Sequence, residues 1–375
     1  MIIGVPKETK VHEYRVGLTP ASVRELVGHG HDVRVESGAG AAIDFSDADY
    51  RSAGATIASG PAELFAAADL IVKVKEPLAP ERARLRENQV LFTYLHLAPD
   101  PLQAKDLIAS RAVCIAYETV TSQAGALPLL APMSEVAGRM SIQAGASALE
   151  KSHGGRGVLL AGVPGVAPGK VVILGGGVVG LNAAQMAVGL GADVTVIDRS
   201  IDVLRRIDAR FGGAVKTLYS TQAAIEAEAI EADLVIGAVL VAGAAAPKLI
   251  ERALLQRMKR GAVLVDVAID QGGCFETSRP TTHDDPTYEV DGIVHYCVAN
   301  MPGAVARTST LALNNATLSF VLALADKGWR KALREDAHFR DGLNVAAGKV
   351  THRAVAEALG LAYSPAEAAI LAEAA

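Results

Sequence analysis

The sequence predicts an α/β protein made of two doubly wound, Rossmann-like domains with parallel sheets, joined by long helices. Three observations support this fold class. The chain has 375 residues, more than one ordinary core accommodates. Half of the residues are hydrophobic but only 4% are aromatic, which suits tightly packed α/β layers. Short apolar runs alternate with helical patterns along the chain, the pattern of βαβ units.

In the first half, the runs "DVRVES", "DLIVKVK", "QVLFTYLHL" and "AVCIAYETV" are expected to be strands. Segments such as "PASVRELVGHG" and "DPLQAKDLIAS" between them are expected to be helices. We expect residues 1–130 to form a first domain with a parallel sheet. A long helix that begins near Pro132 is expected to lead into a second domain.

The strand pattern restarts with "KVVILGGG", "DVTVID", "AVKTLYS", "DLVIGAV" and "AVLVDVAID", which predicts a second parallel sheet. Residues 131–305 are expected to form this second, Rossmann-like domain. The pattern "TSTLALNNATLSFVLALADKG" predicts another long helix that returns to the first domain. The remainder of 306–375 has no strand-like run, so we expect it to pack on the first domain as helices.

Composition argues against several classes of function. The net charge is −5, from 36 basic and 41 acidic residues without long blocks of one sign, which gives no footprint for nucleic acid or an anionic membrane. Three widely spaced cysteines imply neither a disulfide framework nor a Cys-x-x-Cys metal site, and the histidines form no metal-binding cluster. The N-terminus does not resemble a signal peptide. We expect a cytoplasmic protein that acts on small molecules and binds no metal.

The stretch "VVILGGGVVGLNAAQMA" carries a G-x-G-x-x-G motif at Gly175, Gly177 and Gly180, between a predicted strand and a predicted helix. Such glycines permit a tight turn, close approach of the backbone to a pyrophosphate and close helix packing. Asp198 ends the next predicted strand, where a carboxylate accepts hydrogen bonds from the adenosine ribose and repels a 2′-phosphate. Residues 131–305 are therefore expected to be the NAD-binding domain, although Arg199 leaves NADP as an alternative cofactor.

Open parallel sheets bind ligands at the carboxyl ends of their strands. The residues expected to line one crevice by this rule are Ser220, Val239, Leu240, Asp270, Asn300 and Met301. Asp270 follows the buried run "VLVDVAI" and would lie beside the nicotinamide. Alone, Asp270 is equally consistent with a residue that caps the next turn.

Within residues 1–130, four polar residues near predicted strand or loop ends are candidates for substrate chemistry, so we expect this domain to bind the substrate and to be the catalytic one. Arg15 and Lys75 would form a cationic clamp for a carboxylate, and His96 would be an acid–base group. Tyr94 is expected on the same strand face as His96. Taken alone, Arg15 and Lys75 would more often be surface charges, and a histidine at a strand end such as His96 would more often be structural. Their occurrence together beside a dinucleotide motif favours a functional role.

The sequence resembles alanine dehydrogenases through "GVPKETKVHEYRVGLTPASVRELVGHG", "KVKEP", "LFTYLHLA", "YETV", "LPLLAPMSEVAGRM", "VDVAIDQGGCFETSRPTTHDDP" and "YCVANMPG". The resemblance implies that Arg15 and Lys75 bind the substrate and that His96 and Asp270 are the catalytic pair. It also implies a homo-oligomer, a hexamer. The residues expected to bind NAD, from the motif and the resemblance together, are Ser134, Gly175, Gly177, Val178, Gly180, Asp198, Ser220, Val239, Leu240, Val267, Ile269, Asp270, Asn300 and Met301.

Two departures from the family pattern lie near Arg15: His12 where the family usually has Asn, and Gly17 where it usually has Ala. We expect these to loosen the loop that carries Arg15. The activity implied is the reversible oxidative deamination of L-alanine to pyruvate and ammonium with NAD. Two alternatives remain, a transhydrogenase component that passes hydride to another nucleotide-binding domain and a nonenzymatic NAD sensor.

Overall fold

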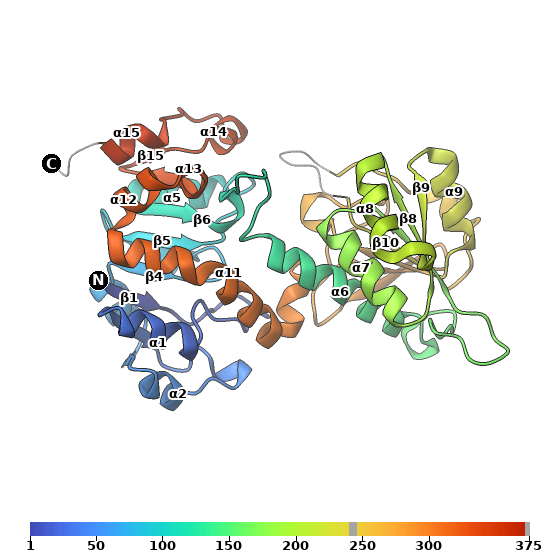
Figure 1. The fold of residues 1–375 in the computed structure, drawn as a ribbon, viewed down its shortest axis with the longest axis horizontal. Coiled ribbons are helices and arrows are strands. Elements are labelled where there is room, and N and C mark those ends of the chain that lie inside the picture. The colour runs from blue at the N-terminus through green and yellow to red at the C-terminus, as the bar shows by residue number, and fades with distance from the viewer. Residues whose placement is uncertain (240–245, 372–375) are drawn as a thin grey trace. The chain divides into compact units, whose positions relative to one another are not determined.

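The computed structural model describes residues 1–239 and 246–371. The chain divides into two compact units, one formed by Met1–Pro132 and Val305–Ala375 and the other by Met133–Ala304 (Figure 1). Each unit contains one mostly parallel sheet with interleaved helices, which confirms the predicted fold class.

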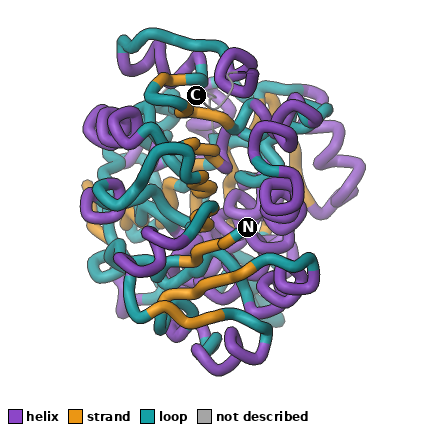
Figure 2. Tube along the Cα trace, turned by 90° about the vertical axis from the view of Figure 1, so that its left-hand side faces the viewer, coloured by secondary structure: helices purple, strands orange, loops and turns teal. Residues whose placement is uncertain are grey.

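The sheet of the first unit has eight strands in the order β15-β14-β6-β5-β4-β1-β2-β3. Strands β1 to β6 pair parallel with one another, and those near the N-terminus run side by side in Figure 2. The strands are β1 (Ile2–Val5), β2 (Asp32–Glu36), β3 (Thr56–Ala58), β4 (Leu70–Val72), β5 (Val90–Thr93), β6 (Val113–Ala116), β14 (Leu343–Ala346) and β15 (Lys349–Val350).

The expectation that residues 306–375 contain no strands is wrong. Strand β14 pairs antiparallel with β6, and β15 pairs antiparallel with β14. Ala347 and Gly348 form the turn of this hairpin with φ of 50° and 75°, as a two-residue hairpin loop requires. Strands of four and two residues are too short to show a clear alternation of apolar and polar residues in the sequence.

The helices of the first unit flank its sheet. They are α1 (Pro20–Gly28), η1 (Ala41–Ile43), α2 (Asp47–Ser52), α3 (Pro61–Ala67), α4 (Ala79–Arg82), α5 (Pro101–Ser110), η2 (Tyr117–Thr119), α11 (Ala306–Lys327), α12 (Trp329–Glu335), α13 (Ala337–Arg340), α14 (Arg353–Leu359) and α15 (Ala366–Leu371). Strands β4, β5 and β6 are buried at every residue, as expected for a parallel sheet that is covered on both faces.

The segment Met301–Lys327 is long and apolar enough to cross a membrane. Its most apolar stretch of 18 residues has a mean hydropathy of 1.2, but 44% of that stretch is buried inside the structure. Its buried polar residues show that it packs as a core helix. The amide oxygen of Asn314 accepts the backbone N–H of Thr19 at 2.8 Å and the hydroxyl of Ser22 at 3.0 Å. These contacts tie α11 to the start of α1.

The sheet of the second unit has seven strands in the order β12-β13-β11-β10-β7-β8-β9. Without the antiparallel edge strand β12, this is the 3-2-1-4-5-6 order of the doubly wound dinucleotide fold. The strands are β7 (Lys170–Leu174), β8 (Asp193–Asp198), β9 (Val215–Tyr219), β10 (Leu234–Gly237), β11 (Val263–Asp266), β12 (Thr287–Val290) and β13 (Ile293–Tyr296).

The helices of the second unit include a long first helix and the crossover helices of the sheet. They are α6 (Ala131–Ala148), η3 (Lys151–His153), α7 (Val178–Gly189), α8 (Ile201–Phe211), η4 (Gly212–Ala214), α9 (Gln222–Glu231), α10 (Arg252–Leu255), η5 (Ile269–Gln271) and η6 (Met301–Val305). The strand order reverses between β7 and β10, so the carboxyl ends of these two strands flank the expected ligand crevice.

Candidate functional site

The glycine-rich turn follows β7 at the point where the strand order reverses. Gly175 has a φ of 100°, and a Cβ there would lie 2.7 Å from the carbonyl oxygen of Ala238. A Cβ on Gly180 would lie 1.8 Å from the carbonyl oxygen of Gly175. A Cβ on Gly177 would meet open space just before α7 begins at Val178. The turn therefore needs glycine for its own shape and leaves an open approach to the helix N-terminus, as a pyrophosphate requires.

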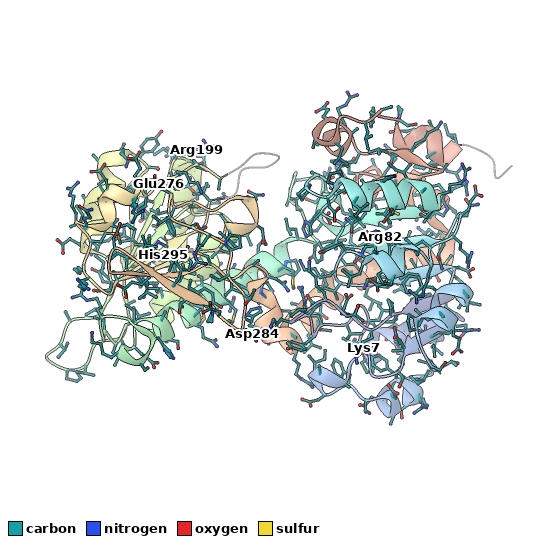
Figure 3. All side chains as sticks on the ribbon, turned by 180° about the vertical axis from the view of Figure 1, so that it is seen from behind. Lys7, Arg82, Arg199, Glu276, Asp284 and His295 are labelled. Atoms are coloured by element: carbon teal, nitrogen blue, oxygen red, sulfur yellow. The ribbon has the colours of Figure 1, made fainter. Side chains whose placement is uncertain are left out.

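Asp198 is the last residue of β8 and is partly exposed. Its two carboxylate oxygens accept the backbone N–H groups of Gly176 and Ser200, each at 2.7 Å. This links the end of β8 to the glycine turn. Each oxygen has a second lone pair that can accept a ribose hydroxyl, so the residues fit an adenosine dinucleotide. Arg199, which is labelled in Figure 3, is exposed and directly follows this acid in the chain.

Most of the other predicted cofactor contacts of the second unit follow strands of its sheet. Register pairs Gly237 with both Leu174 and Asp266, so the ends of β10, β7 and β11 are neighbours. Ser220, Val239, Val267 and Ile269 follow strand ends directly or within three residues, and Asn300 and Met301 follow β13; Ser134 lies in the first turn of α6. Leu240 lies outside the described residues.

Asp270 lies in the short helix η5, four residues after the end of β11, and its side chain is exposed. The N-cap of η5 is Ala268, so Asp270 does not cap this turn. The turn ends at Gly272, which has a φ of 87°. Asp270 is thus presented at the carboxyl edge of the sheet without the structural role that its sequence context also allowed.

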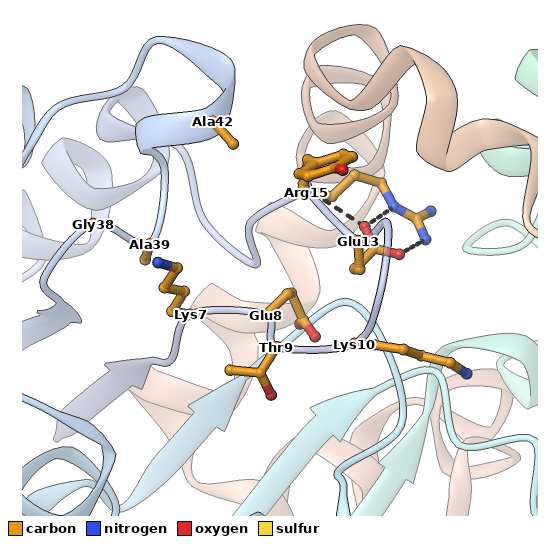
Figure 4. Close-up of a pocket in the computed structure, with 10 residues that line it drawn as sticks. Lys7, Glu8, Thr9, Lys10, Glu13, Arg15, Gly38, Ala39 and Ala42 are labelled. Carbon is orange, nitrogen blue, oxygen red and sulfur yellow. Dashed lines mark hydrogen bonds and ion pairs between the residues drawn. The ribbon is translucent and has the colours of Figure 1, made fainter. Parts of the chain in front are cut away.

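In the first unit, Arg15 is not a surface charge, because only 2% of it is exposed. Its Nε and Nη2 donate to the two carboxylate oxygens of Glu13, at 2.7 and 2.5 Å (Figure 4). Burial opposes the charge of Arg15, but the hydrogen bond and the negative charge of Glu13 raise its pKa. Glu13 therefore holds the guanidinium in one orientation.

A cavity of about 270 Å³ opens beside Arg15 (Figure 4). Its lining residues are Lys7, Glu8, Thr9, Lys10, Glu13, Tyr14, Arg15, Gly38, Ala39 and Ala42. Of the four predicted substrate residues, Arg15 lines this cavity, whereas Lys75, Tyr94 and His96 do not.

Lys75 follows β4 by three residues and is partly buried. The backbone N–H groups of Val74 and Lys75 donate to Oε1 of Glu8, at 2.7 and 3.3 Å. The ammonium of Lys73 lies 2.9 Å from Glu8 and 2.9 Å from Glu81, and all three side chains are buried. Burial raises the pKa of Glu8, although Lys73 works against this shift. Glu8 thus fixes the backbone from which Lys75 extends.

His96 lies just beyond β5, with a φ of 48° and a side chain that is 45% exposed. Its backbone N–H donates to Oε1 of Glu118 at 2.6 Å. The ring of Tyr94 stacks on the imidazole, with centroids 5.8 Å apart and planes 7° apart. Neither residue is in the strand, so the prediction of a shared strand face is wrong. The Tyr94 hydroxyl donates to the carbonyl of Leu129 at 2.6 Å, so its ring supports His96.

Sequence reasoning did not identify Glu8, Glu13 or Glu118. Glu118 lies in η2 directly after β6, the neighbour of β5 in the sheet. The strand-end rule that selected Asp270 could have selected Glu118 if it had been applied to the first sheet.

The two departures near Arg15 do not loosen its loop. A Cβ on Gly17 would lie 2.4 Å from the carbonyl oxygen of Val72, so glycine allows this segment to pack closely on the end of β4. His12 has a φ of 57°, a region that His, like Asn, occupies more readily than most residues. Its Nδ1 lies 3.1 Å from the hydroxyl of Tyr14.

Among the other titratable groups of the described residues, His295 has a structural role. His295 is buried in β13 (Figure 3), with Nε2 2.7 Å from the Thr277 hydroxyl and Nδ1 3.0 Å from the carbonyl of Ile293. Burial lowers its pKa. Within residues 1–239 and 246–371, no group of three or more His, Cys, Asp and Glu residues could hold a metal ion.

Comparisons with known proteins cover almost the whole chain. The alanine dehydrogenase/PNT N-terminal and C-terminal domain models match residues 4–137 and 141–353. The chain is 65% identical to the alanine dehydrogenase of Halomonas elongata over 97% of this chain and 98% of that protein. It is 56% identical to the alanine dehydrogenase of Bacillus subtilis over 99% of this chain and 98% of that protein.

Two solved structures are similar to the fold. An L-alanine dehydrogenase has a TM-score of 0.93 and 53% identity, covering 96% of this chain and 99% of that chain. A transhydrogenase from Sinorhizobium meliloti has a TM-score of 0.81 and covers 94% of this chain and 100% of that one, but at 24% identity it shows only a shared fold. The family and the nucleotide-binding fold imply a pyridine nucleotide cofactor. The chain therefore belongs to the alanine dehydrogenase/PNT family of oxidoreductases.

Proposed function

We propose that this chain catalyses the reversible oxidative deamination of L-alanine to pyruvate and ammonium with NAD. The observation that carries the proposal is the 65% identity to an alanine dehydrogenase over 97% of the chain, which spans both units. In this proposal, residues 1–130 and 306–375 supply the substrate chemistry and residues 131–305 bind the cofactor.

The substrate carboxylate is bound by Arg15, since a planar guanidinium pairs with a carboxylate through two parallel hydrogen bonds. The bond to Glu13 sets the plane of the guanidinium before substrate arrives. Lys75 polarises the carbonyl of pyruvate. Glu8 fixes the backbone at Lys75, because it accepts a hydrogen bond from the backbone N–H of Lys75. Tyr94 assists through its ring, which stacks on His96.

Bound NAD supplies the hydride acceptor for the Cα–H bond of alanine, and an imine results. Water then adds to the imine carbon, and ammonia leaves the carbinolamine. We assign His96 as the group that takes a proton from the attacking water and returns it in the reverse direction, because an imidazole can serve as base and acid near neutral pH. Asp270 assists proton transfer or orients the water.

The preference for NAD is assigned to Asp198, which accepts ribose hydroxyls and repels a 2′-phosphate. Arg199 beside it is the feature that would favour NADP instead. We also propose that the protein is cytoplasmic. We further propose that it assembles as a homohexamer, and light scattering coupled to size-exclusion chromatography would test this assembly.

The test of the activity is NADH absorbance with L-alanine and NAD, and then with pyruvate, ammonium and NADH. Turnover in both directions is expected, and its absence in both would refute the proposal. A parallel assay with NADH and a second pyridine nucleotide, without amino acid, separates this enzyme from a transhydrogenase component. Binding of NADH without turnover in any assay would indicate a sensor.

A further inference from the structure

Asp266, the last residue of β11, is completely buried and binds the loop that follows it. This loop, residues 267–275, carries Asp270. Oδ1 of Asp266 accepts the N–H of Ala268 at 3.1 Å. Oδ2 accepts the N–H groups of Cys274 and Phe275 at 2.7 and 3.3 Å. One carboxylate therefore holds both ends of the 267–275 loop.

Two further contacts complete this arrangement. The hydroxyl of Ser278 donates to Oδ2 of Asp266 at 2.5 Å. From the 246–250 segment, the ammonium of Lys248 donates to the carbonyl oxygens of Gly272, Gly273 and Phe275, at 2.5, 2.9 and 3.1 Å. An anion thus binds N–H groups of the loop while a cation binds its carbonyl groups.

The glycines around Asp266 make room for this carboxylate. A Cβ on Gly273, whose φ is 77°, would lie 2.6 Å from Oδ2 of Asp266. A Cβ on Gly237 would lie 2.9 Å from the ring of Phe275 and 3.3 Å from Oδ1 of Asp266. Larger residues at either position would push the carboxylate away from the loop.

Asp266 fits its site as a carboxylate. Burial raises its pKa, while the hydrogen bonds from Ser278 and from the loop N–H groups oppose that shift. The three backbone N–H groups can only donate, so they match an acceptor with charge on both oxygens. A proton on Oδ2 would instead face two of these donors.

We propose that Asp266 is a positioning residue which, together with Lys248, fixes the 267–275 loop and so sets the location of Asp270. The inference rests on the proposed function, in which Asp270 acts in proton transfer. Asp266 itself is buried beneath the loop and has no direct role in the chemistry.

The first test is Asp266→Asn. The amide nitrogen cannot accept a hydrogen bond. Either the N–H of Ala268 or the N–H groups of Cys274 and Phe275 therefore lose their acceptor. We expect faster amide hydrogen exchange in residues 267–278 and a fall in kcat of about 100-fold, the cost of misplacing a reacting group by about 1 Å. NADH affinity should fall less than kcat, because the glycine turn and Asp198 are unaltered and only the expected cofactor contacts at Val267, Ile269 and Asp270 lie in this loop.

Asp233→Asn is the matched control. Asp233 is another buried carboxylate of the second unit, and it accepts the N–H of Lys170 and a donor of Arg156, both at 2.8 Å. It precedes β10, at the opposite edge of the sheet from the 267–275 loop. We expect this variant to lose stability while keeping the wild-type kcat and the wild-type hydrogen exchange of residues 267–278.

The second test is a double-variant cycle. If Asp266 acts through Asp270, Asp266→Asn should lower kcat no further when Asp270 is already Asn. Independent, multiplied losses would overturn the inference, as would a folded Asp266→Asn protein with wild-type kcat and loop exchange. If Asp266→Asn does not fold, Lys248→Met takes its place in the cycle with Asp270→Asn, and the same outcomes apply. Lys248 is exposed, so its removal leaves the core intact. A wild-type protein without alanine turnover would refute the proposed function, whereas the exchange measurement would still report on the loop.

Discussion

The carboxylate of Glu118 accepts the backbone N–H of His96 at 2.6 Å and holds this residue in a left-handed conformation with a φ of 48°. A non-glycine residue in this region costs about 1–2 kcal/mol, so it persists only where neighbouring bonds compensate. Glu118 supplies such bonds, since it also accepts the N–H of Leu95 at 3.1 Å. The direction of the imidazole therefore depends on a carboxylate from the neighbouring strand end.

Removing this carboxylate should impair turnover without abolishing cofactor binding. In Glu118→Ala, the N–H groups of Leu95 and His96 lose their acceptor, and we expect kcat to fall by about 100-fold from misplacement of the imidazole. Glu118→Gln keeps one acceptor oxygen and should recover part of the loss. Steady-state rates with NADH fluorescence titration would measure both effects. Wild-type kcat in folded Glu118→Ala would show that His96 does not need this support.

Asp198 should determine the choice of cofactor. In Asp198→Ala the charge that repels a 2′-phosphate is lost, so the ratio of kcat/KM for NAD to that for NADP should fall. Overall NAD affinity should also decrease, because Asp198 binds the N–H of Gly176 in the glycine turn. Asp193→Ala, at the other end of β8, is the control and should leave the ratio unchanged. Equal kcat/KM for both cofactors in the unmutated enzyme would refute the assignment.

Arg15 should anchor the substrate. Lysine keeps the charge but cannot form the two-pronged bond to Glu13 or to a carboxylate, so Arg15→Lys should raise the KM for pyruvate by about tenfold or more, the equivalent of one or more charged hydrogen bonds. NADH affinity should not change. Arg34→Lys, which alters a surface pair with Asp32, serves as the control. Unchanged pyruvate kinetics in Arg15→Lys would assign Arg15 a purely structural role.

Lys73 should contribute mainly to stability. In Lys73→Met, the buried Glu8 and Glu81 lose their shared cation, and we expect unfolding free energy to fall by about 3–5 kcal/mol. Lys10→Met, which removes a more exposed pair with Glu76, should cost only about 0–1 kcal/mol. Denaturant unfolding would measure both.

The loss of unfolding free energy in Lys73→Met should depend on pH because of Glu8, whose pKa is raised by burial. A carboxyl group with a higher pKa in the folded state destabilises the protein above that pKa, and the penalty disappears as the pH falls below the unfolded value. The loss in Lys73→Met should therefore shrink as the solution is acidified. A loss that grew on acidification would contradict this explanation.

The parts of the site that could be predicted from sequence are local ones. The glycine turn and Asp198 lie within one βαβ unit, where spacing alone determines geometry. The tie between Glu118 and His96 joins residues 22 apart in sequence, and Glu8 reaches Val74 across 66 positions. Such pairings follow from strand order, which a single sequence indicates only weakly.

The same limitation explains the missed hairpin of β14 and β15. Its four-residue strand is recognisable only by its pairing with β6, more than 200 residues earlier in the chain. The burial of Arg15 was equally hard to foresee, because this residue lies in a polar stretch that resembles a surface loop. In the structure, Gly17 packs closely on Val72 and Arg15 forms a buried ion pair with Glu13.

The strongest test of the proposed chemistry is the removal of His96 and Asp270 one at a time. Loss of a general acid–base group typically costs about 10²–10⁴-fold in rate, so His96→Ala and Asp270→Asn should each lose most turnover. Both should fold and bind NADH, because Gly175, Gly180 and Asp198 are untouched. His153→Ala and Asp202→Asn, at exposed positions, are the matched controls and should keep the wild-type kcat.

Steady-state rates beside NADH fluorescence titration would distinguish the possible roles of His96 and Asp270. A wild-type kcat in either folded variant would remove that residue from the mechanism. Loss of NADH binding together with a lower unfolding free energy in His96→Ala would mean that the imidazole supports the fold, since its ring stacks on the buried Tyr94. Retained folding and NADH affinity with little turnover is the result expected if His96 carries the proton.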